Sequence, residues 1–360
     1  MSAAHPFVSS EEETPRPVST TVYTGGLMQF RAFREAIGDT CDIVLPGNLE
    51  SFQAHNNTVV FGNAVLSEMR SVSLNYSRRA RHIARSGYSH YQINANLAGQ
   101  TVFHCGRQNV VLRPGDVCIL DTTRPVEAFA QARPGGESRS LSLFLPRDVL
   151  APFLPHASGG HCTLISGGAP DGRLLYEHLI ALMSRAQTAS TVLLETAVKQ
   201  IVERVASALE ARAASPDATP WSIKRYLDAH LHAPDLLSSE VICHRFACSR
   251  ATLYRLFENE GGLVNYIQRR RLQHALMELI SPGSRRRIID IAMENHFSGE
   301  STFNRAFRRQ FDITPGEARR LAQIPQAPDN ALVLRASEDP GPLAIRWIRE
   351  LGPLVRPAGR

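Results

Sequence analysis

The feature that most constrains the fold is a helical pattern that occurs twice, 50 positions apart. In the second copy, HFSGESTFNRAFRRQF, aromatic residues recur at four-residue intervals: Phe303, Phe307 and Phe311. In the first copy, CSRATLYRLFENE, the corresponding places are taken by Leu253 and Phe257. Side chains four residues apart share one face of an α-helix. We therefore expect two helices, each of which buries an apolar face and exposes an opposite face that carries arginine.

A shorter apolar segment and a tight turn precede each of these helices. The segments are SEVICHRF in the first copy and RRRIIDIAMEN in the second, where Ile288, Ile291 and Ala292 share a helical face. Ser249 is placed to cap the main helix of the first copy by accepting a backbone hydrogen bond. Two short helices joined by a tight turn form a helix-turn-helix, whose second helix enters a DNA major groove about 12 Å wide. The sequence predicts two such units.

The segment between the copies, NYIQRRRLQHALMELI, predicts one continuous linker helix. Leu272, Leu276 and Leu279 fall on one face of it. A helix of about 16 to 18 residues is roughly 25 Å long. Such a stiff spacer can set two reading helices into successive major grooves on one side of the duplex, about 34 Å apart.

Helical spacing also predicts which side chains read bases. Arg can bond guanine, and Asn adenine, through two hydrogen bonds, and each good pair contributes about 1 to 3 kcal/mol of discrimination. The base-facing candidates in the first copy are Arg250, Ala251, Thr252, Tyr254 and Arg255. Those in the second copy are Glu300, Ser301, Thr302, Asn304 and Arg305. The candidates for phosphate contacts, which fix register without reading sequence, are Arg285, Arg286, Arg287, Arg308 and Arg309.

The charge distribution agrees with a polyanionic partner for this region. The chain holds 40 Lys and Arg against 34 Asp and Glu, a net charge of +6. Residues 221–324 contain 16 of the basic and 11 of the acidic residues, so most of the basic excess lies in under a third of the chain. An arginine-rich helix face is also a common solvated surface. The duplication and the stiff spacer favour DNA binding, because an ordinary helical bundle needs neither.

Cysteine usage and hydropathy bear on the compartment. The six cysteines form no CxxC pair and no Cys/His cluster at zinc spacing, which predicts thiols in a reducing cytosol instead of a disulfide scaffold or a zinc finger. The segment MSAAHPFVSSEEETPRP is acidic where a signal peptide is basic and then apolar, and no 18 apolar residues run together. We expect a soluble, cytoplasmic protein that does not contact a membrane.

The first half of the chain has the pattern of strands and turns. In YQINANL, residues 91–97, apolar and polar residues alternate with the two-residue period of a half-buried strand. Further short apolar runs, separated by turns such as RPGD, predict a small barrel or sandwich from about 55 to 146. Helical spacing follows, with a stripe formed by Leu194, Val198, Ile201, Val205 and Leu209. Packing against the barrel and a dimer interface are the two alternatives for this stripe.

Residues 221–320 resemble the DNA-binding domain of the AraC/XylS family of bacterial transcription regulators. The resemblance rests on SRATLYRLFENEGG, YIQRRRLQHA, IIDIAMENHFSGESTFNRAFRRQF and ITPGEARR, in this order. It implies two helix-turn-helix units that bind a promoter half-site and contact RNA polymerase. His296 and Asp312 stand where the family usually has Gly, at positions that need a positive φ, which His and Asp tolerate better than most residues.

The amino-terminal half resembles the cupin-like sensor domain of AraC-type regulators, through LRPGDVCILDTTRPVEAF and LSLFLPRDVL. This implies a small organic effector, for which aromatic acids or amines are candidates, and a homodimer formed through the helices that follow. We expect a multidomain α+β protein with an N-terminal cupin-like β-barrel and flanking helices, and a C-terminal all-α domain with two helix-turn-helix motifs joined by a linker helix.

The expected domain boundaries follow from composition and from the resemblance. They are a disordered tail at 1–20, a ligand-sensing and dimerisation domain at 21–212, a linker at 213–220, the DNA-binding domain at 221–322 and a tail of uncertain structure at 323–360. The predicted function is a DNA-binding transcription factor that activates a bacterial catabolic operon in response to a ligand.

A metal-dependent cupin enzyme fused to a helical module is the alternative. A cupin metal site needs several nitrogen and oxygen ligands to converge, typically from a His-x-His pair. In the barrel segment His82, His90 and His104 stand singly, so we predict no metal, no cofactor and no catalytic residues. Asp116 and Asp121 flank a tight turn and are expected to accept backbone hydrogen bonds there.

Overall fold

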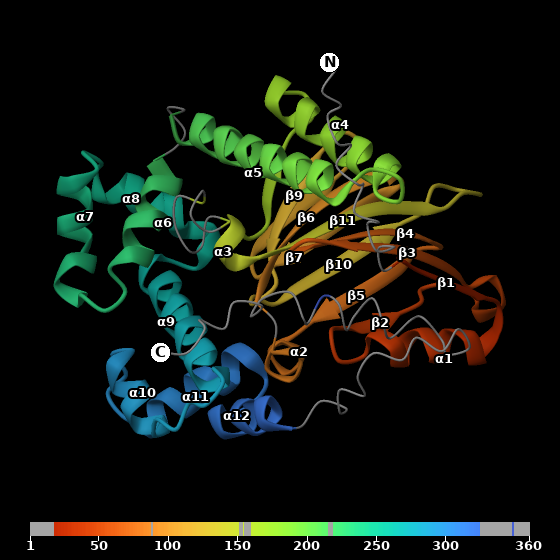
Figure 1. The fold of residues 1–360 in the computed structure, drawn as a ribbon. Coiled ribbons are helices and arrows are strands. Elements are labelled where there is room, and N and C mark those ends of the chain that lie inside the picture. Colours follow the sequence, from red (N-terminus) through yellow and green to blue (C-terminus); the bar gives the residue numbers. More distant parts are fainter. Residues whose placement is uncertain are drawn as a thin grey trace, which may run out of the picture.

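The computed structural model describes residues 18–87, 89–150, 154, 160–214, 219–324 and 348. Two antiparallel sheets face each other in the amino-terminal part, with helices around them, and the carboxy-terminal part is entirely helical (Figure 1). The predicted α+β class, with a barrel-like domain followed by an all-α domain, is confirmed.

Strand order in the larger sheet is β1-β3-β4-β11-β6-β9-β12. These strands are β1 (Val18–Thr24), β3 (Gln53–Phe61), β4 (Ala64–Ser71), β11 (Ser138–Pro146), β6 (His90–Ala98), β9 (Val117–Asp121) and β12 (Thr163–Ile165). The smaller sheet has the order β2-β5-β10-β7-β8. Its strands are β2 (Asp42–Val44), β5 (Leu74–Arg78), β10 (Val126–Gln131), β7 (Gln100–Cys105) and β8 (Gln108–Leu112).

The strands extend beyond the range 55–146 that the sequence predicts, and β1 shows why. This strand pairs with β3 from Val18 opposite Val59 onward. Its buried face carries Ser19 and Thr21, whereas Val18 and Val22 are exposed. Because the usual apolar pattern is inverted, hydropathy gave no sign of a strand here. The last three residues of the predicted tail at 1–20 therefore lie in β1, and residues 1–17 lie outside the described residues.

The polar face of β6 points into the protein and not toward solvent. Tyr91, Ile93 and Ala95 pack on one side of the larger sheet, in its main core. On the opposite side Asn94 and Asn96 are 5% and 1% exposed. The prediction of a half-buried strand is wrong, because the second sheet closes over the polar face and makes it the wall of a cavity.

Helices flank both sheets in the amino-terminal domain. They are α1 (Gly26–Ile37), α2 (Ala80–Ser86), α3 (Arg147–Leu150), α4 (Pro170–Arg185) and α5 (Thr191–Ala214). The helices α4 and α5 cover the outer face of the larger sheet (Figure 1). The apolar stripe from Leu194 to Leu209 is buried there with Leu141 and Leu143 of β11. Of the two alternatives for this stripe, the structure shows packing against the barrel.

The helical domain begins after α5. Its helices are α6 (Thr219–Ala229), α7 (Ser239–Arg245), α8 (Arg250–Phe257), α9 (Leu263–Ile280), α10 (Ile288–Glu294), α11 (Glu300–Phe311) and α12 (Pro315–Gln323). The predicted linker at 213–220 overlaps the end of α5 and the start of α6, and residues 215–218 of it lie outside the described residues. Of the predicted tail at 323–360, residues 323, 324 and 348 are described.

The linker helix α9 belongs to two separate cores. Leu263 and Ile267, near its start, are buried with Phe257 of α8. Leu272 and Leu276, farther along, are buried in a second core that contains α10, α11 and α12. The helix has 18 residues, which corresponds to about 27 Å. Because each end is fixed in its own core, α9 sets the separation of the two units as a rigid rod.

The helix α2 of the barrel domain completes the second of these cores. Ala80, Ile83 and Ala84 are buried there against residues of α9 and α12, and α2 lies beside α12 in Figure 1. A hydrogen bond of 2.7 Å joins the same two domains, from Gln273 Nε2 on α9 to the carbonyl oxygen of Thr123. The barrel domain is therefore docked on the helical domain through apolar and polar contacts.

The expectation that the cysteines are free thiols is wrong for two of the six. Cys105, at the end of β7, and Cys162, before β12, form a disulfide bond although 57 residues separate them. Spacing along the chain could not reveal this pair, since the sheet brings the two residues together. Cys41, Cys118 and two further cysteines are free thiols. Across the described part of the chain, no helix has the length and hydropathy needed to cross a bilayer.

Candidate DNA-binding surface and barrel cavity

The first helix-turn-helix consists of α7 and α8. Ser249 caps α8 as predicted, since its hydroxyl oxygen accepts a hydrogen bond of 3.0 Å from the backbone N–H of Thr252. Leu253 and Phe257 on the inner face of α8 are fully buried. In the turn, the N–H of Cys248 donates to a carbonyl oxygen of α7. The unit thus fixes α8 by one apolar face and leaves the other to solvent.

The second unit, α10 and α11, repeats this geometry with larger side chains. The rings of Phe303 and Phe307 lie 5.4 Å apart and those of Phe307 and Phe311 lie 4.7 Å apart, and all three are buried. The turn bond recurs, with the N–H of Phe297 donating to the carbonyl oxygen of Ala292. The three phenylalanine rings anchor α11 to α9 and α12, which explains why this helix is so rich in phenylalanine.

The turns contain residues with left-handed backbone conformations. His296 and Asp312 both have φ of 60°, which confirms that these positions need a positive φ. Ala247, in the turn of the first unit, has φ of 47°, and sequence reasoning did not single it out. Ala247 is the second residue after α7, and His296 is the second residue after α10. The two units therefore share one turn geometry.

The side chains predicted to face bases lie on the outer surfaces of α8 and α11. Those that are exposed are Arg250, Ala251, Tyr254, Arg255, Glu300, Ser301, Thr302 and Arg305. Two are half-buried, Thr252 and Asn304. The structure therefore brings each predicted set together on one accessible helix face. One set lies at each end of the rod formed by α9.

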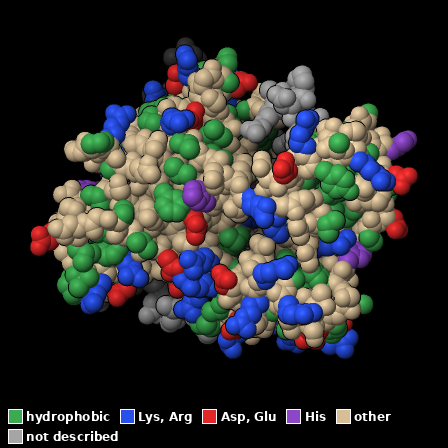
Figure 2. Space-filling model, turned by 180° about the vertical axis from the view of Figure 1, so that it is seen from behind, with side chains coloured by type: hydrophobic (Ala, Val, Ile, Leu, Met, Phe, Trp, Pro, Cys, Tyr) green, Lys and Arg blue, Asp and Glu red, His purple; other side chains and the backbone are tan. Residues whose placement is uncertain are grey.

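The predicted phosphate-contacting arginines are all exposed, but two of them already have acidic neighbours. Arg286 forms ion pairs with Glu278 and Glu294, and Arg287 pairs with Asp290. Such exposed pairs contribute little to stability, and a phosphate group can replace the carboxylate. Seen from behind, the part of the molecule that holds the helical domain carries many Lys and Arg side chains (Figure 2).

A buried ion pair stiffens the helical domain at the middle of α9. Arg270 Nε lies 2.7 Å from Asp228 Oδ1 of α6, and the two side chains are 10% and 2% exposed. Burial lowers the pKa of Arg270, but the charge and hydrogen bond of Asp228, together with Tyr266 and Asp121, hold the pKa above its ordinary value. Arg124 of the barrel domain lies close by, and its pKa is lowered by burial and by the charge of Arg270.

A cavity of about 250 Å³ lies between the two sheets of the barrel. One wall, from the larger sheet, carries uncharged hydrogen-bonding side chains that bond one another. Ser67 Oγ donates to Asn56 Oδ1 over 2.7 Å, and Ser142 Oγ donates to Asn94 Oδ1 over 2.9 Å. The opposite wall is largely apolar, with Phe103, Val126, Ala128 and Ala130. The cavity thus offers a polar side and an apolar side to an occupant.

Arg78 and Ile348 are cavity residues that sequence reasoning missed. Arg78 ends β5, is 8% exposed and lines the cavity. Ile348 comes from the segment predicted as a tail of uncertain structure, is 5% exposed and packs on Val65 of β4. Its carbonyl oxygen lies 2.5 Å from Nε2 of His90, whose pKa is lowered mainly by burial. A charged residue at a strand end and an isolated isoleucine carry no pattern that could have identified them.

The last residue of β9, Asp121, is a buried carboxylate. As predicted, the Asp121 carboxylate accepts a backbone hydrogen bond, from the N–H of Thr123 over 3.0 Å. Burial raises the pKa of Asp121, but Arg147 and the Thr123 hydroxyl more than offset it and hold the pKa below its ordinary range. Burial and the charge of Arg124 together lower the pKa of His161 to about 3. Asp116 likewise accepts from the N–H of Gly167.

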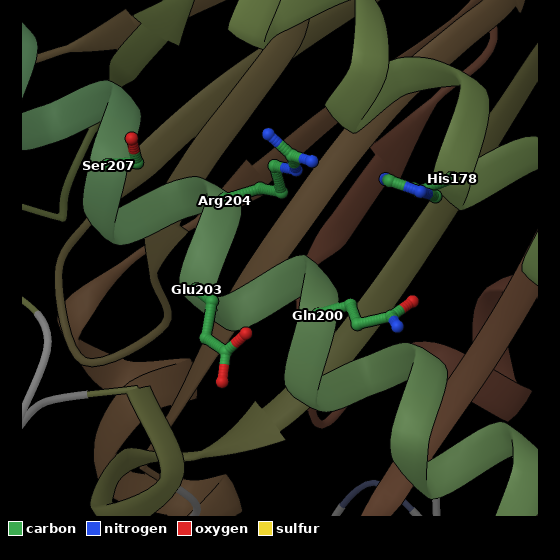
Figure 3. A pocket seen from close by; sticks show the side chains of 5 residues that line it. All are labelled: His178, Gln200, Glu203, Arg204 and Ser207. Atoms are coloured by element: carbon green, nitrogen blue, oxygen red, sulfur yellow. The ribbon is translucent and has the colours of Figure 1, made fainter.

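A second hollow lies on the outer side of α4 and α5 and measures about 360 Å³ (Figure 3). His178 of α4 faces it, together with Gln200, Glu203, Arg204 and Ser207 of α5. Most of these side chains are exposed. Over the part of the chain that the structure describes, no three His, Cys, Asp or Glu side chains gather in a way that suits a metal ion.

Comparisons with known proteins agree with both halves of this geometry. A family model described as a helix-turn-helix domain matches residues 242–321, and one described as an AraC-binding-like domain matches residues 40–210. Regulatory protein SoxS of Escherichia coli (strain K12) is 38% identical over 96 residues, which are 26% of this chain and 86% of SoxS.

The chain belongs to the AraC/XylS family of transcription regulators.

Other relatives match this AraC/XylS regulator over a similar stretch. The right origin-binding protein of Escherichia coli (strain K12) is 35% identical over 97 residues, or 26% of this chain and 32% of that protein. Among solved structures, the AraC-like transcriptional activator CuxR aligns with a TM-score of 0.49 at 23% identity, over 72% of this chain and 95% of that one. The alternative of a metal-dependent enzyme receives no support from these comparisons.

As an AraC/XylS regulator, the protein is a DNA-binding transcription factor, and DNA is its partner. The helix-turn-helix match begins within α7 and ends within α12, so it contains α8, α9 and α11. All the residues predicted to read bases or to contact phosphates lie inside it. The AraC-binding-like match contains the strands β3 to β12, which enclose the cavity, together with nearly all of α5.

Proposed function

We propose that the outer faces of α8 and α11 read two successive major grooves of promoter DNA. The observation that carries this is the arrangement around α9, whose two ends are buried in two cores, each of which anchors one candidate reading helix. The exposed side chains Arg255 and Arg305 are the strongest candidates for contacts to guanine, which Arg binds through two hydrogen bonds. Arg308 and Arg309, exposed on the last turns of α11, serve as phosphate contacts.

The experiment is binding-site selection with the full chain, followed by mobility shifts on the selected DNA. Arg255→Ala and Arg305→Ala are each expected to lower affinity by roughly 5- to 150-fold, the equivalent of about 1 to 3 kcal/mol, and to relax preference at one or two base pairs. Arg133→Ala is the matched control, since Arg133 is exposed in the turn after β10 of the barrel domain. Equal effects from all three variants would exclude α8 and α11 as the reading helices.

We propose further that the barrel cavity binds a small organic effector and that the protein is a ligand-responsive activator of a bacterial catabolic operon. A cavity of about 250 Å³ with one polar and one apolar wall is suited to a small organic molecule. The contact between the barrel domain and α9, through Gln273 and Thr123, provides a route by which occupancy shifts the population able to bind two sites. DNA binding that no small molecule alters would contradict this part.

The remaining elements of the proposal follow from the family resemblance. They are a contact to RNA polymerase, a cytoplasmic location and a homodimer formed through the helices after the barrel. The outer sides of α4 and α5 carry exposed apolar residues, among them Leu174, Ile180, Val192 and Leu193, which supports this dimer surface. Light scattering tests it, since Leu193→Glu is expected to convert dimer to monomer. An unchanged mass for that variant would place the interface elsewhere.

A further inference from the structure

A disulfide bond lies at one corner of the barrel, where the edges of the two sheets meet. Cys105 ends β7 of the smaller sheet, and Cys162 directly precedes β12 at the edge of the larger sheet. Their Cα atoms are 6.3 Å apart, within the range that a disulfide bond spans. Gln108 crosses the same corner, since its Nε2 donates to the carbonyl oxygen of Cys162 over 3.2 Å. The bond therefore ties the turn between β7 and β8 to the segment in front of β12.

The turn between β7 and β8 touches the first helix-turn-helix unit. The guanidinium carbon of Arg107, in this turn, lies 3.1 Å from the place that a Cβ on Gly261 would occupy. Gly261 lies between α8 and α9, directly after the 3-10 helix η5 (Glu258–Glu260). Because Gly261 has no side chain, the guanidinium group can lie against its backbone. The turn that follows Cys105 therefore contacts the junction of α8 and α9.

The segment in front of β12 faces α9 farther along. His161, the neighbour of Cys162, is 8% exposed, and its Nδ1 accepts a hydrogen bond of 3.3 Å from the backbone N–H of Asp121. Burial lowers the pKa of His161 most, and the charges of Arg124 and of Arg270 on α9 lower it further. The disulfide bond thus links two parts of the barrel that face the DNA-binding domain, one beside the start of α9 and one close to its middle.

The two sulfur atoms differ in their access to solvent. Cys105 is half-buried next to the exposed turn residues 106–109, whereas Cys162 is 1% exposed. Disulfide bonds that solvent reaches are the labile ones, and those of cytosolic proteins are mostly transient and redox-sensing. Cys118, buried in the same apolar cluster, is a poor nucleophile because burial raises the pKa of its thiol. The pair therefore offers one reachable sulfur atom and one sheltered partner for it.

We infer that Cys105 and Cys162 form a reversible oxidation site for small hydroperoxides, and that closing their bond fixes the turn between β7 and β8 against the first helix-turn-helix unit. The inference rests on the proposed cytoplasmic location and otherwise goes beyond the proposed function, because this signal is separate from any occupant of the cavity. Cys162 has φ of 56°, a left-handed conformation that few residues other than glycine adopt. With the bond open, Cys162 is free to leave this conformation, and the two segments move independently.

Oxidation proceeds in two steps. The Cys105 thiol attacks one oxygen of the peroxide, the O–O bond breaks, and water or an alcohol leaves with the thiol proton as a sulfenic acid forms. The Cys162 thiol then attacks the Cys105 sulfur atom, the S–O bond breaks, and water leaves as the disulfide bond forms. The sulfur pair loses two electrons and two protons, and the peroxide gains them. A small dithiol returns both through a mixed disulfide with Cys105 and is itself oxidised.

The experiment oxidises the reduced full chain with hydrogen peroxide. Mass spectrometry is expected to find the linked peptide of Cys105 and Cys162 before the free thiols Cys243 and Cys248 react, and dithiothreitol is expected to open the bond in the folded protein. Hydrogen exchange of residues 258–262 is expected to be at least about threefold slower in the oxidised protein, because Arg107 is then held over Gly261. Exchange in α1, which packs in a separate cluster of the barrel domain, is expected to stay unchanged.

Variants separate the oxidation site from the contact that it controls. Cys105→Ser is expected to hold exchange at 258–262 at the value of the reduced parent protein, whatever the peroxide concentration. Cys41→Ser is its matched control, because Cys41 is another half-buried cysteine of the barrel domain. Arg107→Ala is expected to form the linked peptide like the parent protein, while exchange at 258–262 no longer depends on it. Arg113→Ala, exposed in the turn after β8, is the control for that variant.

The comparison of the oxidised and reduced parent protein decides the question even if Cys105→Ser does not fold. A different linkage that forms first, or a bond that dithiothreitol opens only in unfolded protein, would overturn the inference. So would equal exchange at 258–262 in the two redox states. None of these readouts involves DNA. A protein that binds its selected DNA but fails these tests refutes the oxidation site alone, whereas failure to select any DNA refutes the proposed function.

Discussion

Replacing Ala247 by glycine is expected to stabilise the first helix-turn-helix, although it removes a methyl group. Ala247 is exposed and has φ of 47°, so its Cβ contributes little packing and lies in the left-handed region. A residue with a Cβ costs about 1 to 2 kcal/mol there. Glycine avoids this cost but loses about 0.5 to 1 kcal/mol through its greater freedom in the unfolded chain. We expect a net gain of about 1 kcal/mol.

The matched control is Ala251→Gly, which deletes the same methyl group from an exposed position within α8. There the backbone is helical, and glycine costs about 1 kcal/mol relative to alanine. The two variants should therefore differ by about 2 kcal/mol, or roughly 30-fold in the opening equilibrium. Hydrogen exchange of the amides of α7 and α8 in the full chain measures this local stability. Faster exchange in both variants would refute the argument from backbone conformation.

Three further predictions concern the reading helix, a buried histidine and the buried ion pair. Arg308→Ala is expected to weaken binding to all DNA sequences alike and to lower the slope of log affinity against log salt concentration by about one. Arg305→Ala is expected to alter sequence preference instead. Salt titrations of both variants test this difference. Burial lowers the pKa of His82 to about 4, so the unfolded chain binds more protons than the folded chain between about pH 4 and 6.5. His82 is therefore expected to contribute about 2 kcal/mol to the fall in stability from neutral pH to pH 5. His82→Gln should reduce the slope in urea unfolding by this amount, while the contributions of His90 and His161, whose pKa values burial also lowers, remain. Asp228→Ala leaves the buried Arg270 without its carboxylate and is expected to cost about 3 to 5 kcal/mol, which the same unfolding assay detects; a loss below about 1 kcal/mol would contradict the burial of the pair.

Much of the helical domain could be predicted from the sequence because its determinants are local. Phe303, Phe307 and Phe311 fall on one side of a helix by their spacing alone, and the structure buries all three. The continuous linker helix, the cap at Ser249 and the positive φ of His296 follow from the same short-range rules. The residues proposed to touch DNA were found in the same way, because the exposed side of such a helix is fixed once its buried side is known.

The barrel could be predicted less well, because its structure depends on contacts between residues far apart in the sequence. Alternation along β6 correctly separates Asn94 from Ile93, but it cannot tell whether the polar side meets water or a second sheet. The buried serine and threonine of β1, and the disulfide bond of Cys105, depend on strands that pair across long stretches of chain. A two-residue period in hydropathy shows only that the two faces of a strand differ, and not what each face contacts.

The amino-acid sequence by itself determined the two helix-turn-helix units and the rod between them, because the periodicity of a helix depends on neighbouring residues. Only the tertiary structure decided that the polar strand faces enclose a cavity, that α2 enters the core of the other domain and that Arg78 is buried among three separate segments. Those features arise where segments far apart in the chain meet. A buried charge is stable only where folding brings acceptors such as Thr40, Ser86 and Thr122 around it.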